Sequence, residues 1–238
     1  AASRAAQDRL AGPRGLHFLL FIVSTGGRRA SAAVLDTAVD FGRALLNCVL
    51  AAHLIKRQSS GINNGTGDVT MKIQQAAAQL YTLRDSMTTP DDMARTLKAV
   101  RGIGYQAVQV SGVGPIAPKA LRKLLDDNGL TCCSTHEDAA EIVNNTEAII
   151  EKLRTLGSPT TAIPWLGKEH RSGEGFKRFI AATNAACAKM KAAGIDLMYH
   201  NHAFEFEKVN GRLLLDVIYS ETDLKAEIDT YWVQVGGG

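Results

Sequence analysis

Short apolar runs alternate with amphipathic stretches along residues 71–238. Six runs of strand-like character begin near Ile73, Tyr105, Leu130, Thr160, Ile195 and Ala226. Stretches with helical periodicity fill the gaps between these runs. Strand alternating with helix in units of about 30 residues predicts parallel strands joined by right-handed crossovers. Six strands in this order fit either an open doubly wound sheet or part of a β/α barrel.

Five helices are predicted from apolar spacing and from Gly and Pro at the boundaries. The first has Thr89 as its cap and Pro90 at its first position. The predicted spans are residues 90–101 before Gly102, 118–128 before Gly129, about 145–156 before Gly157, a stretch through 176–190 that stops at Gly194, and a short helix near 213–219.

The densest cluster of polar groups follows the fifth apolar run. Residues 199–207 include His200, His202, Glu205 and Glu207. In a strand, positions i and i+2 share a face, so His200 and His202 should point the same way. Paired imidazoles with carboxylates are costly to bury without a partner, which favours a metal or proton-transfer site. Glu207, next to a lysine, fits a solvated loop better.

Further chemistry-bearing residues stand where the other strands should end. They are Gln109 after the second strand, His136 after the third, Trp165 after the fourth, and Asp229 near the end of a sixth strand at 226–233. Catalytic groups gather at the carboxyl ends of parallel strands, so these side chains should converge. The last three also have a structural interpretation: a core histidine, a core tryptophan, or an aspartate that caps a turn.

The segments at these strand ends resemble a known family. From Met71 to Gly238 the chain resembles the xylose-isomerase-like TIM-barrel superfamily, specifically the sugar phosphate isomerase/epimerase group. The resemblance rests on residues 79–84, 108–112, 199–206 and 227–233, of which the last two segments are the most specific in combination. It implies a (β/α)8 TIM-barrel fold with a divalent metal ion (Mn²⁺, Mg²⁺, Co²⁺ or Zn²⁺) at the carboxyl end.

The resemblance also implies a ligand set for that metal. Relatives use a Glu from strand five, an Asp from strand six, a His from strand seven and a Glu from strand eight. Asp229 matches the strand-six ligand by position. Glu205 best matches the strand-five ligand, and Glu207 and His200 are the alternatives.

The implied function is a metal-dependent isomerase or epimerase of a small sugar, sugar phosphate or related polyol ketone. Glu205 would be the catalytic base that removes the α proton and gives an enediolate. The residues expected to contact substrate are His136, Trp165, His200, His202 and Gln109, the last standing where many relatives carry a Glu. The alternatives are a dehydratase or lyase using the same metal, a DNA-repair endonuclease on the same barrel, and a catalytically inactive fragment.

The end of the sequence bears on that expectation. The chain stops at residues 236–238, three glycines that in the family lead into the helix before strand seven. A whole barrel needs about 250 residues, so two βα units would be absent. We therefore expect this chain to bind Mn²⁺ or Mg²⁺ weakly or not at all, with negligible isomerase activity.

Residues 1–70 do not share the resemblance. They carry eight Lys or Arg against four Asp or Glu, a formal charge of +4. Apolar residues between Val34 and Ile55 fall at helical spacing, and residues 59–67 have the composition of a linker. The preferred interpretation is a mostly helical extension from a misplaced start, and the alternatives are a targeting peptide or a docking helix. Its deletion should leave the fold of residues 71–238 unchanged.

Composition narrows the classes of partner. Residues 71–238 have a formal charge of −1, which offers no basic surface for nucleic acid. The apolar run at 16–23 is too short to span a bilayer, so no membrane partner is expected. The four cysteines show no metal-binding spacing, which fits a reducing cytoplasm. The expected partner is a small carbohydrate, and a homo-oligomer is compatible with the sequence.

Overall fold

The computed structural model describes residues 76–238. Contacts divide this part of the chain into two compact units, residues 76–133 and residues 134–238, which are described in turn. The predicted N-terminal extension, its linker, and the start of the first strand near Ile73 lie outside the described residues.

The unit at 76–133 begins the alternation of strand and helix. Its elements are β1 (Ala77–Gln79), the 3-10 helix η2 (Leu80–Ser86), α3 (Pro90–Ile103), β2 (Ala107–Val110), α4 (Pro118–Asp127) and the first half of β3 (Thr131–His136). β1 and β2 pair in parallel, with Ala77 opposite Ala107. The backbone N–H of Asp92 donates to the Thr89 hydroxyl, so the predicted cap of α3 is confirmed.

The predicted end of α3 is wrong by two residues. The helix runs through Gly102 to Ile103 and ends at Gly104, whose φ is 118°. A helix stops where a residue adopts the left-handed conformation, which glycine reaches without strain. Two glycines compete here, and the sequence alone does not show which of them turns.

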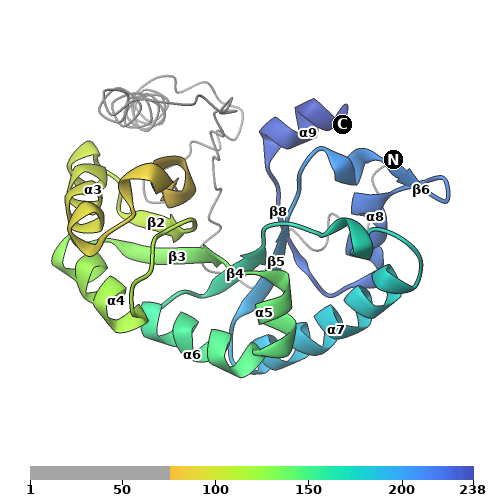
Figure 1. Cartoon of the computed structure of the whole chain (residues 1–238), viewed down its shortest axis with the longest axis horizontal. Coiled ribbons are helices and arrows are strands. Elements are labelled where there is room, and N and C mark those ends of the chain that lie inside the picture. Colours follow the sequence, from red (N-terminus) through yellow and green to blue (C-terminus); the bar gives the residue numbers. More distant parts are fainter. Residues whose placement is uncertain (1–75) are drawn as a thin grey trace, which may run out of the picture. The chain divides into compact units, whose positions relative to one another are not determined.

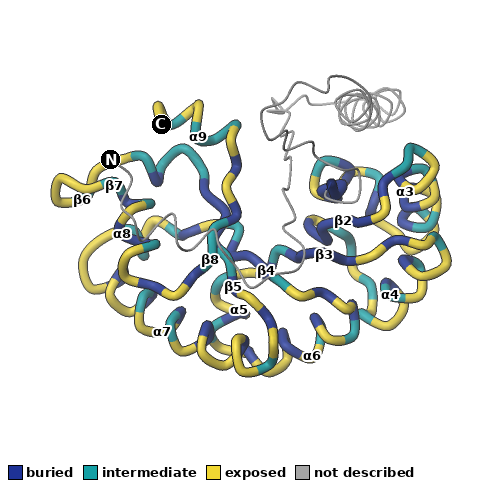
Figure 2. Tube along the Cα trace, turned by 180° about the vertical axis from the view of Figure 1, so that it is seen from behind, coloured by how far each residue is buried: buried dark blue, intermediate teal, exposed yellow. Residues whose placement is uncertain are grey.

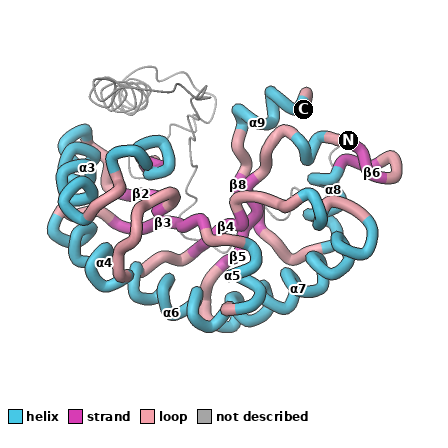
Figure 3. Tube along the Cα trace, viewed as in Figure 1, coloured by secondary structure: helices cyan, strands magenta, loops and turns pink. Residues whose placement is uncertain are grey.

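The unit at 134–238 holds most of the candidate site. Its elements after β3 are α5 (Ala139–Asn144), α6 (Thr146–Leu156), β4 (Thr160–Ile163), η3 (Lys168–His170), α7 (Gly173–Ala192), β5 (Asp196–His200), η4 (Phe204–Phe206), β6 (Lys208–Val209), β7 (Arg212–Leu213), α8 (Leu214–Glu221), β8 (Lys225–Glu227) and α9 (Thr230–Gly236). Figure 3 shows the alternation of strand and helix along this unit. The predicted turns at Gly157 and Gly194 both have positive φ.

The strands form one sheet in the order β1-β2-β3-β4-β5-β8. Within the second unit β3 pairs with β4, β4 with β5, and β5 with β8, all in parallel. Sequential parallel strands joined by helices are the arrangement of a (β/α)8 barrel. The fold is therefore an incomplete TIM barrel, as predicted.

Helices α6 and α7 cover the strands of the second unit (Figure 1), because their apolar side chains share one buried core with those strands. Figure 2 shows buried positions along β4 and β5 and exposed positions on the outer side of the helices. The core contains Ile142, Leu153, Ile163, Met190, Leu197, Tyr199, Ile218 and Leu224, among others. Among the described residues, no helix combines the length and apolar character needed to cross a membrane.

The predicted sixth strand at 226–233 is only partly correct. The strand ends at Glu227, and α9 begins at Thr230 because the Asp229 carboxylate caps it. Oδ1 of Asp229 accepts from the backbone N–H groups of Tyr231 and Trp232, at 2.9 and 3.2 Å. Asp229 thus lies in the turn that follows the strand, and the apolar residues after it belong to helix α9.

The small β6–β7 hairpin was not predicted. Its turn holds Asn210 with φ 52° and Gly211 with φ 81°. An Asn-Gly pair with two positive φ values is the signature of a tight hairpin turn. The signal was present in the sequence, but the two strands that flank it are only two residues long each.

Candidate functional site

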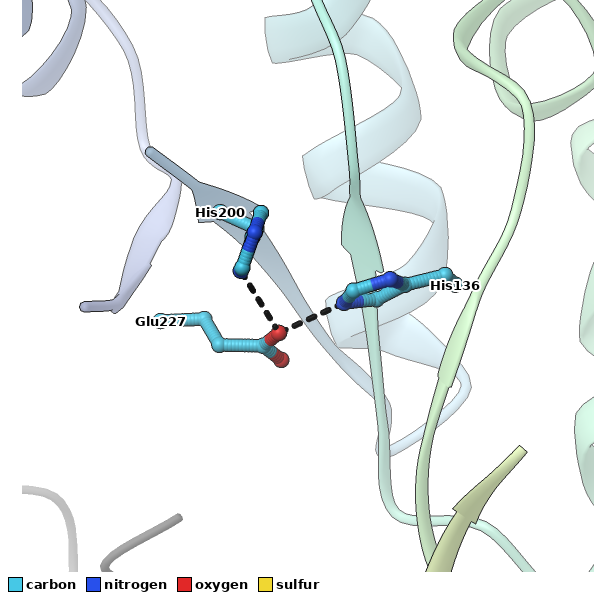
Figure 4. Close-up of side chains that lie close together, drawn as sticks. All are labelled: His136, His200 and Glu227. Carbon is cyan, nitrogen blue, oxygen red and sulfur yellow. Dashed lines mark hydrogen bonds and ion pairs between the residues drawn. The ribbon is translucent and has the colours of Figure 1, made fainter. Parts of the chain in front are cut away.

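Three ionisable side chains meet at the carboxyl ends of β3, β5 and β8. His136, His200 and Glu227 are the last residues of these strands, and His200 stands opposite Glu227 in the parallel register. Figure 4 shows both imidazoles directed at the Glu227 carboxylate. Their ligand atoms all lie within 4.8 Å of one another.

The Glu227 carboxylate stands between the two rings. Its Oε1 lies 2.6 Å from Nε2 of His136 and 3.4 Å from Nδ1 of His200. Burial alone would raise the pKa of Glu227, but its interactions with His136 and His200 outweigh burial and lower the pKa to about 2. Glu227 is therefore an anion at neutral pH, held almost out of solvent with a 4% exposed side chain.

Asp229 adds a second carboxylate on the other side of His200. Its Oδ2 lies 3.7 Å from Nε2 of His200 and, among the described residues, accepts no hydrogen bond. Burial raises the pKa of Asp229 against the opposing effect of its two cap hydrogen bonds. Since Oδ1 is committed to the cap of α9, Oδ2 is the atom of Asp229 that a ligand would use.

Asn201 fixes Asp229 relative to the end of β5. Its Oδ1 accepts from the Asp229 N–H at 2.9 Å, and its Nδ2 donates to the Asp229 carbonyl at 3.2 Å. Both partners are buried. This two-point contact joins the β5 end to the β8–α9 turn, and it explains why an amide stands between His200 and His202.

His202 lies next to the cluster in an aromatic environment. Its ring centroid is 5.0 Å from that of His200, 4.9 Å from Trp165 and 5.1 Å from Trp232. Desolvation is the largest cause that lowers the pKa of His202 to about 4, followed by electrostatic interactions with His200, His136 and Arg171. A neutral imidazole offers one donor and one acceptor, which suits hydrogen bonds to hydroxyl groups.

Arg171 and Trp165 complete this aromatic wall. The Arg171 guanidinium lies 3.4 Å from the centroid of Phe204 and 5.2 Å from that of Trp165. Its Nε and Nη2 both donate to the Leu166 carbonyl at 3.0 Å, which holds the guanidinium in place. Trp165 itself is half exposed, so its ring is open to a ligand.

Glu205 is held by Tyr199 of β5 and by the backbone of its own loop. Its Oε1 accepts from the Tyr199 hydroxyl at 2.7 Å, and its Oε2 accepts from the His202 N–H at 2.8 Å. The residue is fully buried, and burial raises its pKa despite these hydrogen bonds. Each oxygen of Glu205 accepts one hydrogen bond and keeps a second lone pair that could face a ligand. Its predicted roles as ligand and base stay predictions.

The candidate residues are thus distributed unequally between the two units. His136, Trp165, His200, His202, Glu205 and Asp229 all belong to the unit at 134–238. Gln109 belongs to the other unit, where its buried Oε1 accepts from Nε2 of Gln79 at 2.9 Å. Its predicted contact with substrate stays a prediction.

Sequence reasoning missed Glu227, Asn201 and Arg171. A signal for Glu227 existed, because Glu227 and Asp229 stand at i and i+2, the same spacing that singled out His200 and His202. Asn201 looked like a spacer between two histidines. Nothing in the sequence near Arg171 indicated that its side chain packs on Phe204, more than thirty residues away.

The donor atoms at this site fit a divalent metal ion. Nε2 of His200 and Oδ2 of Asp229 face each other, and the carboxylate oxygen is buried without a hydrogen-bond partner in the described part of the chain. A buried unpaired acceptor is unfavourable unless a cation or a donor occupies the space beside it. One imidazole nitrogen with one carboxylate oxygen suits Mn²⁺, Co²⁺ or Zn²⁺ better than Mg²⁺, which prefers oxygen ligands.

Comparison with known proteins supports the fold assignment. No family model matches the chain, and no curated protein matches it. Among solved structures, a sugar phosphate isomerase/epimerase from Parabacteroides distasonis is similar, with 23% identity, a TM-score of 0.61, and coverage of 74% of this chain and 72% of that chain. A xylose isomerase domain protein from Salmonella typhimurium LT2 has 11% identity, a TM-score of 0.52, and coverage of 74% and 65%.

An L-ribulose 3-epimerase structure is also similar, with 18% identity and a TM-score of 0.50, covering 67% of this chain and 61% of that chain. These likenesses, together with the parallel sheet, show that the chain has the fold of the xylose-isomerase-like TIM barrels, as the sequence predicted. Identities this low establish the fold and leave the reaction to be argued from the site.

Proposed function

We propose that this chain carries the active site of a metal-dependent isomerase or epimerase acting on a small sugar, sugar phosphate or related polyol ketone. The observation that carries the proposal is the cluster of His136, His200, Glu227 and Asp229 at the carboxyl ends of β3, β5 and β8. Barrel enzymes place their chemistry at these strand ends. The similarity of the fold to sugar isomerases and epimerases supports the same class of reaction.

His200 and Asp229 would hold the metal ion, through Nε2 and Oδ2. A bound divalent ion would polarise a substrate carbonyl and make the neighbouring C–H more acidic. Glu227 keeps a fixed negative charge beside His136 and His200, and Asn201 holds the Asp229 backbone against the end of β5. These side chains would form a frame beside the bound substrate.

Substrate hydroxyl groups would be recognised by the wall beside this frame. His202 is neutral at neutral pH and can donate to one hydroxyl while accepting from another. Trp165 offers an exposed ring against which the apolar face of a sugar can pack. Arg171, held by the Leu166 carbonyl, places a positive charge at the same wall. We infer that a phosphate or other anionic substituent would be placed toward Arg171.

Proton removal from the α carbon is the step that separates this proposal from its alternatives. The metal-free chain should be loaded with Mn²⁺ and incubated with a panel of ketoses and aldoses in D2O, with proton NMR as the readout. An isomerase or epimerase should incorporate deuterium at the α carbon even where net conversion is slow. Loss of water from the substrate would identify a dehydratase instead.

A matched pair of variants makes this test specific. Asp229→Asn should abolish deuterium incorporation, because it removes a proposed ligand atom. Asp223→Asn changes an exposed carboxylate of the same unit and should leave incorporation unchanged. Incorporation that persists in Asp229→Asn, or loss of water from the substrate without incorporation, would contradict the proposed function.

A further inference from the structure

A single buried carboxyl group closes the loop that follows β5. The pairing of β5 with β4 ends at Tyr199, and its pairing with β8 ends at His200. A backbone N–H beyond that point has no neighbouring strand to donate to and needs another acceptor. Glu205 supplies this acceptor for His202, because its Oε2 lies 2.8 Å from the His202 backbone nitrogen. The end of the strand is thus held by a side chain from four residues further along the loop than Asn201.

The other oxygen of Glu205 returns to the strand itself. Oε1 lies 2.7 Å from the Tyr199 hydroxyl, and the Tyr199 carbonyl accepts from the hydroxyl of Tyr219 on α8. Glu205 and Tyr199 are both fully buried, so water cannot take the place of either group. The two contacts of Glu205 therefore bracket residues 200 and 201, which are the proposed metal ligand and the amide that holds Asp229.

The hold on His202 has a consequence for its side chain. The His202 ring centroid lies 4.9 Å from that of Trp165 and 5.1 Å from that of Trp232, two rings carried by separate segments of the chain. Holding the His202 backbone fixes the point from which its ring projects between these neighbours. A group that reads substrate hydroxyls works only when its position is set by supporting hydrogen bonds.

We propose that Glu205 is a positioning residue that joins Tyr199 to the His202 backbone and so sets the place of the His202 ring. Its effect on substrate, exerted through His202, rests on the proposed function, whereas its hold on the loop does not. This role differs from the base that the sequence predicts, and glutamine separates the two. Its amide oxygen can accept from the His202 N–H while its amide nitrogen donates to the Tyr199 hydroxyl, but it cannot remove a proton.

The test is hydrogen exchange of backbone amides, followed by NMR on the metal-free full chain. The His202 amide should be protected in the wild-type chain. Glu205→Ala should speed its exchange by about 10-fold, and Glu205→Gln should keep its protection. Glu207→Ala removes a neighbouring but exposed carboxylate and should change nothing. Leu153→Ala controls for stability: it removes a fully buried side chain on α6, which weakens the same unit but should leave local exchange at His202 unchanged.

An unprotected His202 amide in the wild-type chain would overturn the proposal, and so would unchanged protection in folded Glu205→Ala. Equal acceleration in Leu153→Ala and Glu205→Ala would also overturn it, because protection would then report only overall stability. If Glu205→Ala does not fold, Glu205→Gln decides: loss of His202 protection in this variant would contradict the positioning role.

The deuterium assay separates positioning from catalysis. Incorporation should be lost in Glu205→Ala and restored in Glu205→Gln, since glutamine keeps both contacts. Loss in both variants would identify Glu205 as the base and overturn the positioning role. Incorporation that persists in Asp229→Asn would instead refute the proposed function, while the hydrogen-exchange result for Glu205 would stand.

Discussion

The buried contact between Tyr199 and Glu205 supports a strong prediction about stability. Tyr199→Phe removes the hydroxyl that donates to Oε1 of Glu205 at 2.7 Å, inside a fully buried site. A hydrogen bond to a charged group contributes about 1.5–3 kcal/mol, and leaving a buried carboxylate oxygen without a donor places the loss at the upper end of that range. We therefore expect the free energy of unfolding to fall by about 3 kcal/mol at neutral pH.

Tyr219→Phe is the control for this prediction. The Tyr219 hydroxyl donates to a neutral acceptor, the Tyr199 carbonyl, at 3.0 Å. Its removal should lower the free energy of unfolding by about 1 kcal/mol. Urea unfolding can be followed through the fluorescence of Trp165 and Trp232, which both lie beside His202. With a slope of about 2 kcal/mol per molar urea, the two variants should differ in midpoint by roughly 1 M.

The pH dependence of the Tyr199→Phe effect has a definite sign. Burial raises the pKa of Glu205 above its ordinary 4.5, so the folded state loses stability as the pH rises from 4.5 through the raised pKa. The Tyr199 hydrogen bond lowers that pKa, and its removal raises the pKa further. The destabilisation should therefore be largest at neutral pH and shrink at acid pH, where Glu205 is protonated in both proteins. Equal effects of Tyr199→Phe and Tyr219→Phe at every pH would refute this reasoning.

Three further predictions concern the aromatic wall and the end of α9. His202 should titrate near pH 4 in the metal-free chain, and an NMR titration that places it near 6.5 would contradict the burial seen here. Trp165→Leu should weaken sugar binding several-fold, measured by calorimetry, with little change in the unfolding midpoint because the ring is half exposed. Gly236→Ala should lower the free energy of unfolding by about 1–3 kcal/mol, because an added Cβ would come within 2.5 Å of the Phe206 ring. Adding Phe206→Ala should relieve that clash, and unfolding curves showing no such relief would count against it.

The fold was predictable because the hydrophobic periodicity agreed with the positions of the glycines that end helices along the chain. Gly129 and Gly157 end helices as expected, with φ values of 60° and 69°. The predictions failed where two local signals competed. Gly102 and Gly104 both could have ended α3, and Asp229 could have ended a strand or started a helix. Such choices depend on packing between distant segments, which periodicity does not encode.

The candidate site was predicted in part for a related reason. The structure brings His136, His200 and Asp229 together because the ends of parallel strands meet at one edge, a consequence of topology that can be read from element order. The partner of each side chain could not be read in this way. Glu227 stands between His136 and His200, and Glu205 bonds to Tyr199 and to the His202 backbone, at distances of a few ångströms that element order does not give.

The central claim, a divalent metal held by His200 and Asp229, is most directly tested by Mn²⁺-induced line broadening of histidine side-chain NMR signals. This method detects weak as well as tight binding. Trace Mn²⁺ should first broaden the side-chain signals of His200, together with those of His136 and His202. The signals of His170 should broaden only at higher Mn²⁺ concentration. Asp229→Asn should remove this selectivity, and Glu205→Gln tests the ligand that the sequence favoured. Broadening that begins at His170, or that is unchanged in Asp229→Asn, would contradict the account.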